Sequence, residues 1–196
     1  ERMPPRFRNF RQWKQQSQSF EDLAMWSDIN VTLTETDDRA SLKPERIEAG
    51  RASANFFPLL GVSVALGRNF SEEEMQPGNG LTAILTDELY RSRFSSQPDI
   101  LNKFIRVDGK QCRVVGVLRR GFRLPSFWEG AERKDPKLWL PIDLQQAEKD
   151  ENMFFNFVFG RLRPGVRLDS AQSEMRVIAE RLRKADPEHN TSFGTN

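Results

Sequence analysis

Few residues of this 196-residue chain have the chemistry of a catalytic or metal-binding group, because it contains one histidine and one cysteine. A structural zinc site needs about four Cys or His ligands, and a disulfide needs paired cysteines. His189 stands in the polar segment 186–190, which favours a solvent-exposed side chain. Cys112 falls on the inward face of a predicted hairpin, which favours a buried, unreactive thiol. We therefore predict no metal site and no cofactor, and no catalytic residue among these two.

The densest group of carboxylates is Glu72, Glu73 and Glu74, which directly follows Ser71. The Ser-x-x-Glu spacing is that of a capping box, in which the side chain of Glu74 bonds back to the Ser71 amide. Acidic residues in a first helical turn also stabilise the helix, because the N-terminal end of the helix dipole is positive. These roles explain the cluster without catalysis, although a hydrolase that uses a carboxylate pair remains an alternative.

The charge balance does not indicate a nucleic-acid partner, since 30 Lys and Arg against 28 Asp and Glu leave a net charge of +2. The run Arg6–Lys14 does interleave cations with aromatic residues, as single-strand binders do. On a helix, however, Phe7, Phe10 and Trp13 gather on one side, which favours packing against a core. Neither Walker A nor G-x-G-x-x-G spacing occurs, so no nucleotide site is predicted.

Local patterns predict alternating short helices and strands along the first third of the chain. The expected elements are a helix over 5–17, strands over 29–34 and 42–51, and a helix over 54–60 capped by Ser53 and closed by Gly61. Gly61 stands where helices commonly end in a left-handed conformation.

The clearest local signal is Asp108-Gly109, which lies between two runs rich in β-branched residues. Both central residues of a type I′ turn need positive φ, so this dipeptide predicts a two-residue hairpin. The other expected elements are a strand over 81–85, a helix over 87–94 capped by Thr86, a strand over 138–140, a strand carrying Phe155, Phe157 and Phe159, and a helix over 169–184 capped by Asp169. The pattern predicts an α+β fold with mostly antiparallel sheets.

No segment is long and apolar enough to predict a membrane span. The longest mostly apolar stretch, 56–67, is interrupted by Pro58, Gly61 and Ser63, whereas a spanning helix needs about 20 apolar residues. The first residues contain no signal peptide. We therefore expect a soluble piece of a larger protein.

Several strings taken in order resemble the MacB-like periplasmic core domain of ABC-transporter permeases of the FtsX/MacB type. They are RASANFFPLLGV at 51–62, ALGRNF at 65–70, TAILTDELYRSRF at 82–94, IRVDG at 105–109 with VVGV at 114–117, WLP at 139–141 and GRLRPGV at 160–166. The N-terminal strings NFRQW at 9–13 and SFEDLA at 19–24 look closest to a subgroup of duplicated orphan permeases from soil acidobacteria.

This resemblance implies a fold of two lobes. A porter-like βαβ lobe built from both chain ends would comprise residues 1–60 plus 153–196. A sabre-like lobe of mixed α+β structure, which contains the hairpin, would be inserted between them as residues 61–152. The family normally adds a final strand before the next membrane helix, and residues 191–196 do not supply one.

The resemblance also implies a non-catalytic extracytoplasmic domain on the periplasmic side of the bacterial cytoplasmic membrane. It would transmit ATPase-driven motion to periplasmic substrates or partner proteins, as in efflux. The implied partners are a separate cytoplasmic ATPase subunit and a periplasmic adaptor or substrate protein, with flanking transmembrane helices outside this chain. An envelope binding module and the carboxylate-based hydrolase are the alternatives.

Overall fold

The computed structural model describes residues 6–35, 43–124, 135–150, 155 and 157–187. The chain divides into two compact units, Glu1–Met25 with Gln146–Asn196 as the first and Trp26–Gln145 as the second. The limits of the predicted lobes, residues 1–60 plus 153–196 and residues 61–152, differ from the limits of these two units. The division into those lobes therefore stays a prediction. Both divisions build one unit from the two ends of the chain.

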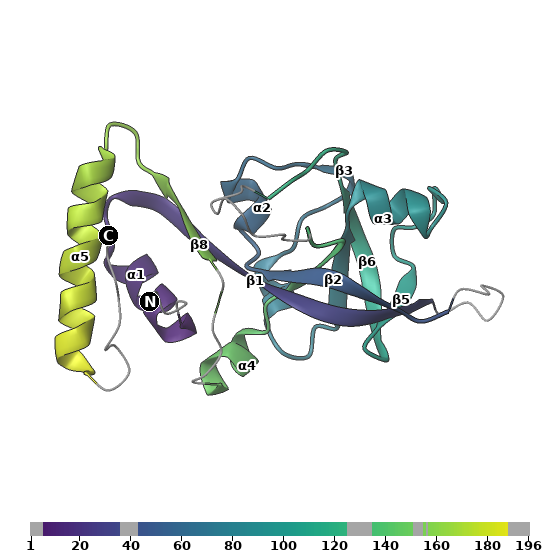
Figure 1. The fold of residues 1–196 in the computed structure, drawn as a ribbon, viewed down its shortest axis with the longest axis horizontal. Coiled ribbons are helices and arrows are strands. Elements are labelled where there is room, and N and C mark those ends of the chain that lie inside the picture. Colours follow the sequence, from purple (N-terminus) through teal and green to yellow (C-terminus); the bar gives the residue numbers. More distant parts are fainter. Residues whose placement is uncertain (1–5, 36–42, 125–134, 151–154, 156, 188–196) are drawn as a thin grey trace. The chain divides into compact units, whose positions relative to one another are not determined.

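The described residues of the first unit form two complete helices and two strand segments. Its elements are α1 (Phe7–Gln16), the first part of β1 (Phe20–Glu35), β8 (Phe157–Leu162) and α5 (Leu168–Ala185), while α4 (Leu144–Lys149) crosses the division. Figure 1 shows α1 beside α5. The predicted helices over 5–17 and 169–184 are confirmed within a few residues.

Aromatic side chains form the core of the first unit. Phe7 and Phe10 are buried on α1, and the ring of Phe7 lies 6.2 Å from that of buried Phe155. On α5, Ala171 and Ile178 of the predicted apolar stripe are buried. Packing of these faces stabilises both helices, since most helical stability in proteins comes from tertiary packing of an amphipathic face.

The predicted cap of α5 is wrong. The helix begins at Leu168, so its N-cap is Arg167, which makes no capping hydrogen bond with its side chain. Asp169 lies inside the first turn, where Arg167 Nε contacts its carboxylate at 3.3 Å. Because the helix begins before Asp169, Asp169 is not the N-cap residue. Its side chain therefore cannot make the predicted capping hydrogen bond.

The second unit is a mixed sheet in which six strands form a closed circuit. Going round the circuit, the neighbours are β1, β2 (Glu45–Ala52), β7 (Leu138–Pro141), β4 (Leu81–Leu85), β6 (Lys110–Leu118), β5 (Phe104–Val107) and again β1. β3 (Val64–Gly67) pairs with the end of β6. The pairs β2–β7 and β4–β6 are parallel and the others antiparallel. The α+β class is confirmed, and closure leaves none of these six strands with a fully exposed edge.

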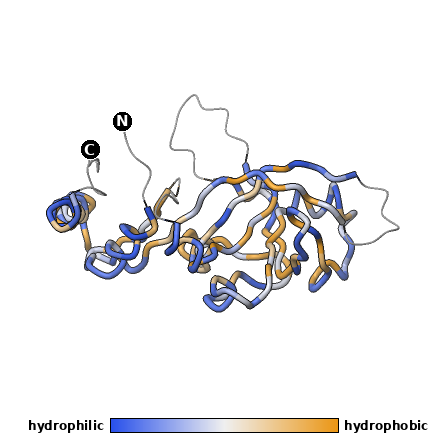
Figure 2. The backbone as a smooth tube through the Cα atoms, turned by 90° about the horizontal axis from the view of Figure 1, so that it is seen from below, coloured by the Kyte–Doolittle hydropathy of each residue, from blue (hydrophilic) through white to orange (hydrophobic). Residues whose placement is uncertain are grey.

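The hydrophobic core of the second unit lies along these strands, and Figure 2 shows the apolar stretches of the chain gathered there. Its buried members from the strands are Val31, Leu33, Ile47, Ala49, Ala83, Leu85, Ile105, Val107, Cys112, Val114, Val117, Leu138 and Leu140. They alternate along β1 and β5 with exposed residues, which is the pattern of strands that bury one face.

A second, aromatic cluster lies under the short helix α2 (Phe56–Leu59). Trp139 of β7 is fully buried and its ring lies 5.4 Å from Phe56, 5.2 Å from Phe57 and 5.6 Å from Trp26. A Cβ atom on Gly50 would lie 2.5 Å from the Trp139 ring, so the neighbouring strand β2 needs glycine at this position.

The predicted cap of this helix is also wrong. The helix begins at Phe56 rather than Ala54, and its N-cap is Asn55. The Ser53 hydroxyl instead donates to Asn55 Oδ1 at 2.7 Å, while the Ser53 carbonyl accepts from the Phe56 amide. Gly61 does follow the helix at φ +71°, as predicted.

The hairpin prediction is confirmed. Asp108 and Gly109 have φ of +50° and +76°, and they connect β5 to β6 with Val107 opposite Lys110. The turn is also tied to β1, because the Thr32 amide donates to Asp108 Oδ1 at 2.8 Å. Thr86 likewise caps α3 (Asp87–Ser92) as predicted, since its hydroxyl accepts from the Leu89 amide.

Replacing Gly109 with valine should lower the free energy of unfolding by about 1–3 kcal/mol, because a β-branched residue resists positive φ. Among the described residues, no atom outside the neighbouring residues lies within 4 Å of a Cβ built there, so backbone strain is the main expected effect. Urea denaturation measures it. Gly109→Asn is the matched control, since asparagine tolerates this conformation, and equal stability of the two variants would contradict the turn assignment.

Candidate functional site

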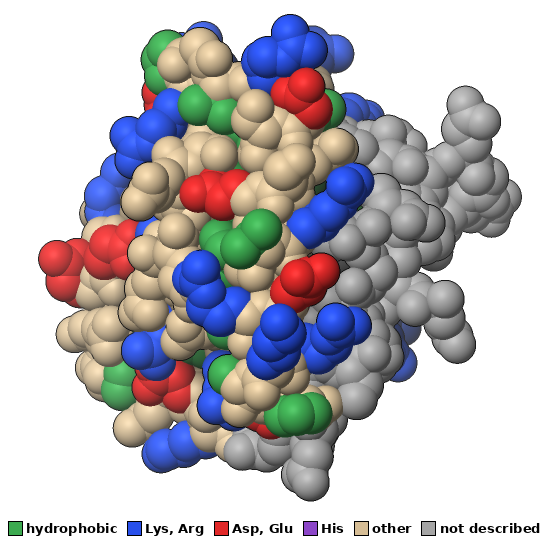
Figure 3. Space-filling view, turned by 90° about the vertical axis from the view of Figure 1, so that its left-hand side faces the viewer, with side chains coloured by type: hydrophobic (Ala, Val, Ile, Leu, Met, Phe, Trp, Pro, Cys, Tyr) green, Lys and Arg blue, Asp and Glu red, His purple; other side chains and the backbone are tan. Residues whose placement is uncertain are grey.

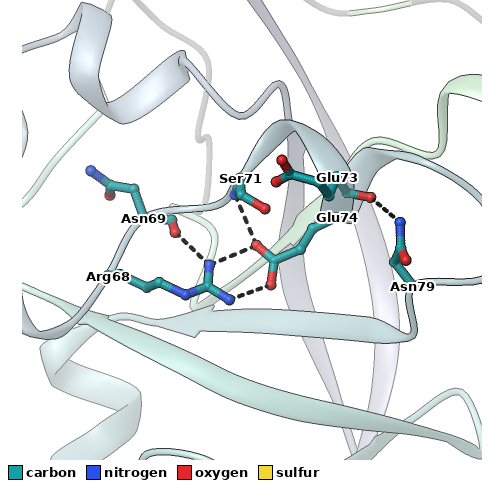
Figure 4. Close-up of polar contacts among 6 residues, drawn as sticks. All are labelled: Arg68, Asn69, Ser71, Glu73, Glu74 and Asn79. Atoms are coloured by element: carbon teal, nitrogen blue, oxygen red, sulfur yellow. Dashed lines mark hydrogen bonds and ion pairs between the residues drawn. The ribbon is translucent and has the colours of Figure 1, made fainter.

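The carboxylate cluster at residues 72–74 belongs to a polar network in the second unit. It follows β3 on η1, a 3₁₀ turn over Glu72–Met75, and Figure 4 shows its contacts. Arg68 donates from Nη1 to Glu74 Oε2 at 2.9 Å and from Nη2 to Oε1 at 2.8 Å. The Ser71 amide also donates to Glu74 Oε2, at 2.9 Å. The predicted capping interaction of Glu74 with Ser71 is therefore present.

The backbone position of Arg68 places its side chain beside η1. Its amide donates to the Val115 carbonyl at 3.0 Å, and a Cβ on Gly116 would lie 2.5 Å from the Arg68 carbonyl. The chain can pass this close to β6 only because residue 116 is glycine. The strand pairing therefore positions the guanidinium, which forms a bidentate pair with a carboxylate six residues later.

Glu74 is ionised in this arrangement. Burial raises its pKa, but the hydrogen bonds from Arg68 and from the Ser71 amide outweigh burial and hold the pKa below its ordinary value. The side chain of Glu74 is only 6% exposed. A general acid near neutral pH needs a raised pKa instead. This geometry suits a carboxylate that fastens a loop, and not one that donates protons.

The neighbouring acidic residues have separate roles. The backbone carbonyl of Glu73 accepts from Asn79 Nδ2 at 2.6 Å, which ties the following loop to η1. The pKa of the exposed Glu73 carboxyl is lowered by a hydrogen bond from Ser71. Among the described residues, no group of three or more His, Cys, Asp and Glu side chains could hold a metal ion.

Replacing Glu74 with glutamine should destabilise the fold by about 1–2 kcal/mol at pH 7, because it removes hydrogen bonds to a charged group. The pKa of Glu74 in the folded protein lies below the unfolded value of about 4.3. Ionised Glu74 therefore contributes stability that is complete above about pH 4.3 and is lost as pH falls through the folded pKa. Urea titrations at pH 7 and pH 3 should show the difference between wild type and Glu74→Gln shrinking at pH 3. Glu72→Gln, at an exposed position, is the control.

The single cysteine is buried, as predicted. Cys112 has no exposed surface, and burial, with a smaller effect of the nearby Glu74 charge, raises the pKa of its thiol to about 12. Such a thiol is almost entirely protonated at neutral pH and is a poor nucleophile. His189 lies outside the described residues.

The aromatic and basic run at the N-terminus is divided between core and surface as the packing interpretation predicts. Phe7 and Phe10 are buried, while Arg8 pairs with Asp186 at 2.8 Å and Arg11 with Glu148 at 2.6 Å. Lys14 pairs with Asp22. Because these cations already have carboxylate partners, the run does not present the open basic track of a single-strand binder.

The outer face of α5 carries charges of both signs. Figure 3 shows Lys and Arg side chains spread over this face with acidic side chains between them and only small, separate hydrophobic areas. Arg176, Arg183 and Lys184 are exposed there, and Val177 is the largest exposed hydrophobic residue in the second half of the helix. This mixture is typical of a solvated helix face.

A more basic surface lies at the turn that follows β6. Arg119 and Arg120 are exposed, have no ion-pair or hydrogen-bond partner for their side chains within the described part of the chain, and line a cavity of about 510 Å³ with Arg91 and Phe122. This turn was not predicted as a site, although its Arg-Arg-Gly-Phe-Arg composition is a visible signal. The pairing of Arg68 with Glu74 was not predicted either.

The mixed sheet and its helices match the fold of the family that the sequence resembles. The chain belongs to the family of MacB-like periplasmic core domains, whose family model matches residues 4–178. Membership implies an extracytoplasmic place on an ABC-type transporter. Within the described residues, no helix has the length and apolarity to cross a membrane.

Solved structures share the fold at low sequence identity. The extracellular domain of the noncanonic ABC-type transporter YknZ from Gram-positive bacteria is 14% identical, with a TM-score of 0.66 over 94% of this chain and 85% of that one. The periplasmic region of MacB from Actinobacillus actinomycetemcomitans is 12% identical, with a TM-score of 0.66 over 96% of this chain and 78% of that one. The search of curated proteins found no match.

Proposed function

We propose that this chain is the non-catalytic extracytoplasmic domain of an ABC-transporter permease that transmits ATPase-driven motion to periplasmic substrates or partner proteins. A separate cytoplasmic subunit would bind and hydrolyse ATP and move the membrane helices, and this domain would carry that motion outward. Family membership supports the place on a transporter, and the mechanical role is our proposal.

The contact between α1 and α5 carries this proposal. These helices are the described elements nearest the two ends of the chain, and they lie together in the first unit. Arg8 pairs with Asp186, Arg181 donates to Gln16, and Glu174 accepts from the Gln18 and Ser19 amides at 2.7 and 2.9 Å. A domain inserted between two membrane helices needs its entering and leaving segments close together, and a bonded pair can move as one.

The pKa of the Glu174 carboxyl also supports a rigid junction. Burial raises it, but the bonds from Ser19 and the Gln18 amide lower it below its ordinary value, so the carboxylate that joins α5 to the segment after α1 is ionised.

We further propose that the predicted lobe of residues 1–60 plus 153–196 is the anchored part. The inserted lobe of residues 61–152 would meet the periplasmic partner.

The experiment uses the full-length permease assembled with its ATPase subunit in lipid nanodiscs that contain acceptor-labelled lipids. A donor fluorophore is attached to the second unit through Lys110→Cys and, in a separate sample, to the first unit through Arg176→Cys. Both side chains are exposed. The native Cys112 can remain, because it is fully buried. We expect ATP to change energy transfer between each donor and the membrane surface.

A hydrolysis-deficient ATPase subunit is the control and should abolish repeated cycling of the signal. If ATP is hydrolysed while energy transfer from both positions stays constant, the mechanical proposal is overturned, and membership in the family is unaffected. If purification of the full-length permease from membranes yields no ATPase subunit, the proposed partnership is overturned instead.

A further inference from the structure

The loop between η1 and β4 contains an asparagine followed directly by a glycine, Asn79-Gly80, and no other asparagine of the sequence precedes a glycine. In this dipeptide the glycine amide nitrogen can attack the asparagine side chain, because glycine has no Cβ to hinder the approach and adopts many backbone conformations. The fold decides whether the reaction proceeds, since the backbone must rotate. Neither the family description nor the proposed mechanical role assigns a modification to this loop.

The loop has the exposure and freedom that this reaction requires. Residues 76–81 are all exposed. Among the described residues, no atom outside the neighbouring residues lies within 4 Å of a Cβ built on Gly78 or on Gly80. Within the same part of the chain, the Gly80 amide donates no hydrogen bond. Neither packing nor hydrogen bonding of Gly80 therefore opposes the rotation of the backbone.

One contact holds the side chain of Asn79. Its Nδ2 donates to the Glu73 carbonyl at 2.6 Å, and Figure 4 shows this bond between the loop and η1. A single hydrogen bond at an exposed position is weak in net terms, because water replaces it easily. The contact engages only the amide nitrogen, which is the leaving group, so it slows the reaction without preventing it.

The hairpin turn Asp108-Gly109 is the comparison within the same chain, since aspartate before glycine can close the same kind of ring with loss of water. Asp108 Oδ1 accepts from the Thr32 amide at 2.8 Å, and the Asp108 amide donates to the Thr32 carbonyl at 2.9 Å. The paired strands β5 and β6 hold both ends of the turn. Rotation here would break the strand pairing, so we expect this dipeptide to stay unmodified.

We propose that Asn79 is a site of spontaneous deamidation, in which the Gly80 amide nitrogen attacks Asn79 Cγ. The new N–C bond closes a succinimide ring while the Cγ–Nδ2 bond breaks, and the Gly80 amide proton leaves with the side-chain amino group as ammonia. Water then opens either carbonyl–nitrogen bond of the ring and gives aspartate or isoaspartate at residue 79. The site does not depend on the mechanical role proposed above.

Deamidation releases the loop from η1. A carboxylate at residue 79 has no hydrogen to donate, so the bond to the Glu73 carbonyl is lost and two acceptors face each other. The change also adds a negative charge beside the acidic residues 72–74, of which Glu74 is paired with Arg68. The loop therefore becomes more mobile, while the pair of Arg68 and Glu74 stays in place.

The test is an incubation of the purified chain in neutral buffer at physiological temperature, followed by digestion at acidic pH and peptide mapping by mass spectrometry. We expect the mass increase of an amide replaced by an acid at residue 79, with both aspartate and isoaspartate present. The rate should rise with pH, because the attacking Gly80 nitrogen must lose its proton. Asp108 should form no isoaspartate in the folded chain, whereas urea should allow reaction at both dipeptides.

Variants of the loop test the attacking group. Gly80→Ala should slow deamidation about tenfold, because a side chain at residue 80 restricts the backbone and hinders the attack. Gln76→Ala is the matched control, since Gln76 is exposed in the same loop and lies outside the dipeptide, and it should leave the rate unchanged.

The variant Asn79→Asp reproduces one product and tests the release of the loop. Amide hydrogen exchange at residues 76–80 should become about fivefold faster than in the wild type, the effect of losing one hydrogen bond. Exchange at the amides of β6 should not change, because the strand pairing is untouched.

The deamidation proposal is overturned if Asn79 keeps its amide in the folded chain while it reacts in urea, since the fold would then protect it. It is also overturned if Gly80→Ala reacts as fast as the wild type. Equal hydrogen exchange in the wild type and in Asn79→Asp would overturn the release of the loop. The comparison of folded and urea-unfolded wild type needs no variant, so it decides the matter even if Gly80→Ala does not fold.

Discussion

Replacing Trp139 with alanine should lower the free energy of unfolding by about 3–5 kcal/mol, the range for removing a fully buried tryptophan. The ring contacts Trp26, Phe56 and Phe57 and lies 6.1 Å from Phe122. Its loss would leave a large cavity between β7 and α2, which surrounding aromatic rings can fill only in part. Urea denaturation monitored by circular dichroism measures the change.

Phe104→Ala is the matched control for this substitution. Phe104 is also an aromatic residue on a strand of the second unit, but it is 50% exposed. We expect its removal to cost less than about 1 kcal/mol, as is usual for surface positions. Similar losses for the two variants would show that the aromatic cluster does not stabilise the unit as described.

Replacing Gly67 with alanine should destabilise the fold by about 2–5 kcal/mol, because two effects add at this position. Gly67 has φ of +74°, which L-residues resist, and a Cβ there would lie 2.1 Å from the Val115 carbonyl oxygen. The neighbour is backbone of the paired strand β6, so it cannot move aside cheaply. Thermal and urea denaturation should both show the loss.

Gly78→Ala separates the two effects. Gly78 also has positive φ, +90°, but within the described part of the chain no atom outside its neighbouring residues lies within 4 Å of its Cβ position. We expect a loss of about 1–2 kcal/mol from backbone strain alone. If Gly67→Ala cost no more than Gly78→Ala, the close approach of β3 and β6 would not exist in solution.

Elements whose signals lie within a few neighbouring residues were predictable from the sequence. The Asp108-Gly109 dipeptide itself favours positive φ at two successive residues, so its turn could be predicted without knowledge of distant contacts. Thr86 and the apolar stripe of α5 were predictable for the same reason, since capping and helical periodicity depend on spacing along the chain. The α+β class follows from these local elements.

The limits of helices depended on more than local signals. Ser53 and Asp169 have the side chains of good caps, but neither occupies the N-cap position. Packing of Phe56 and Phe57 against Trp139 decides where α2 begins, and burial of Ala171 and Ile178 against the first unit decides the phase of α5. Cap preference is worth about 1 kcal/mol, and burial of two large side chains such as Phe56 and Phe57 exceeds it.

The candidate sites were only partly visible in the sequence. The sequence contained Ser71 and Glu74 at capping distance, but the guanidinium of Arg68 reaches Glu74 because pairing of β3 with β6 places Arg68 beside the turn. The burial of Asn9, which is 3% exposed, was not predicted, because it depends on how α1 packs within the first unit.

What the amino-acid sequence determined by itself was chemistry that depends on residue type and near neighbours. One histidine and one buried cysteine, a balanced charge, the turn at Asp108-Gly109 and the family strings are all of this kind. Tertiary structure alone decided that six strands close into a circuit, and that Glu74 is largely buried yet ionised because Arg68 pairs with it. The physical reason is that burial and electrostatic environment depend on residues brought together from distant parts of the chain.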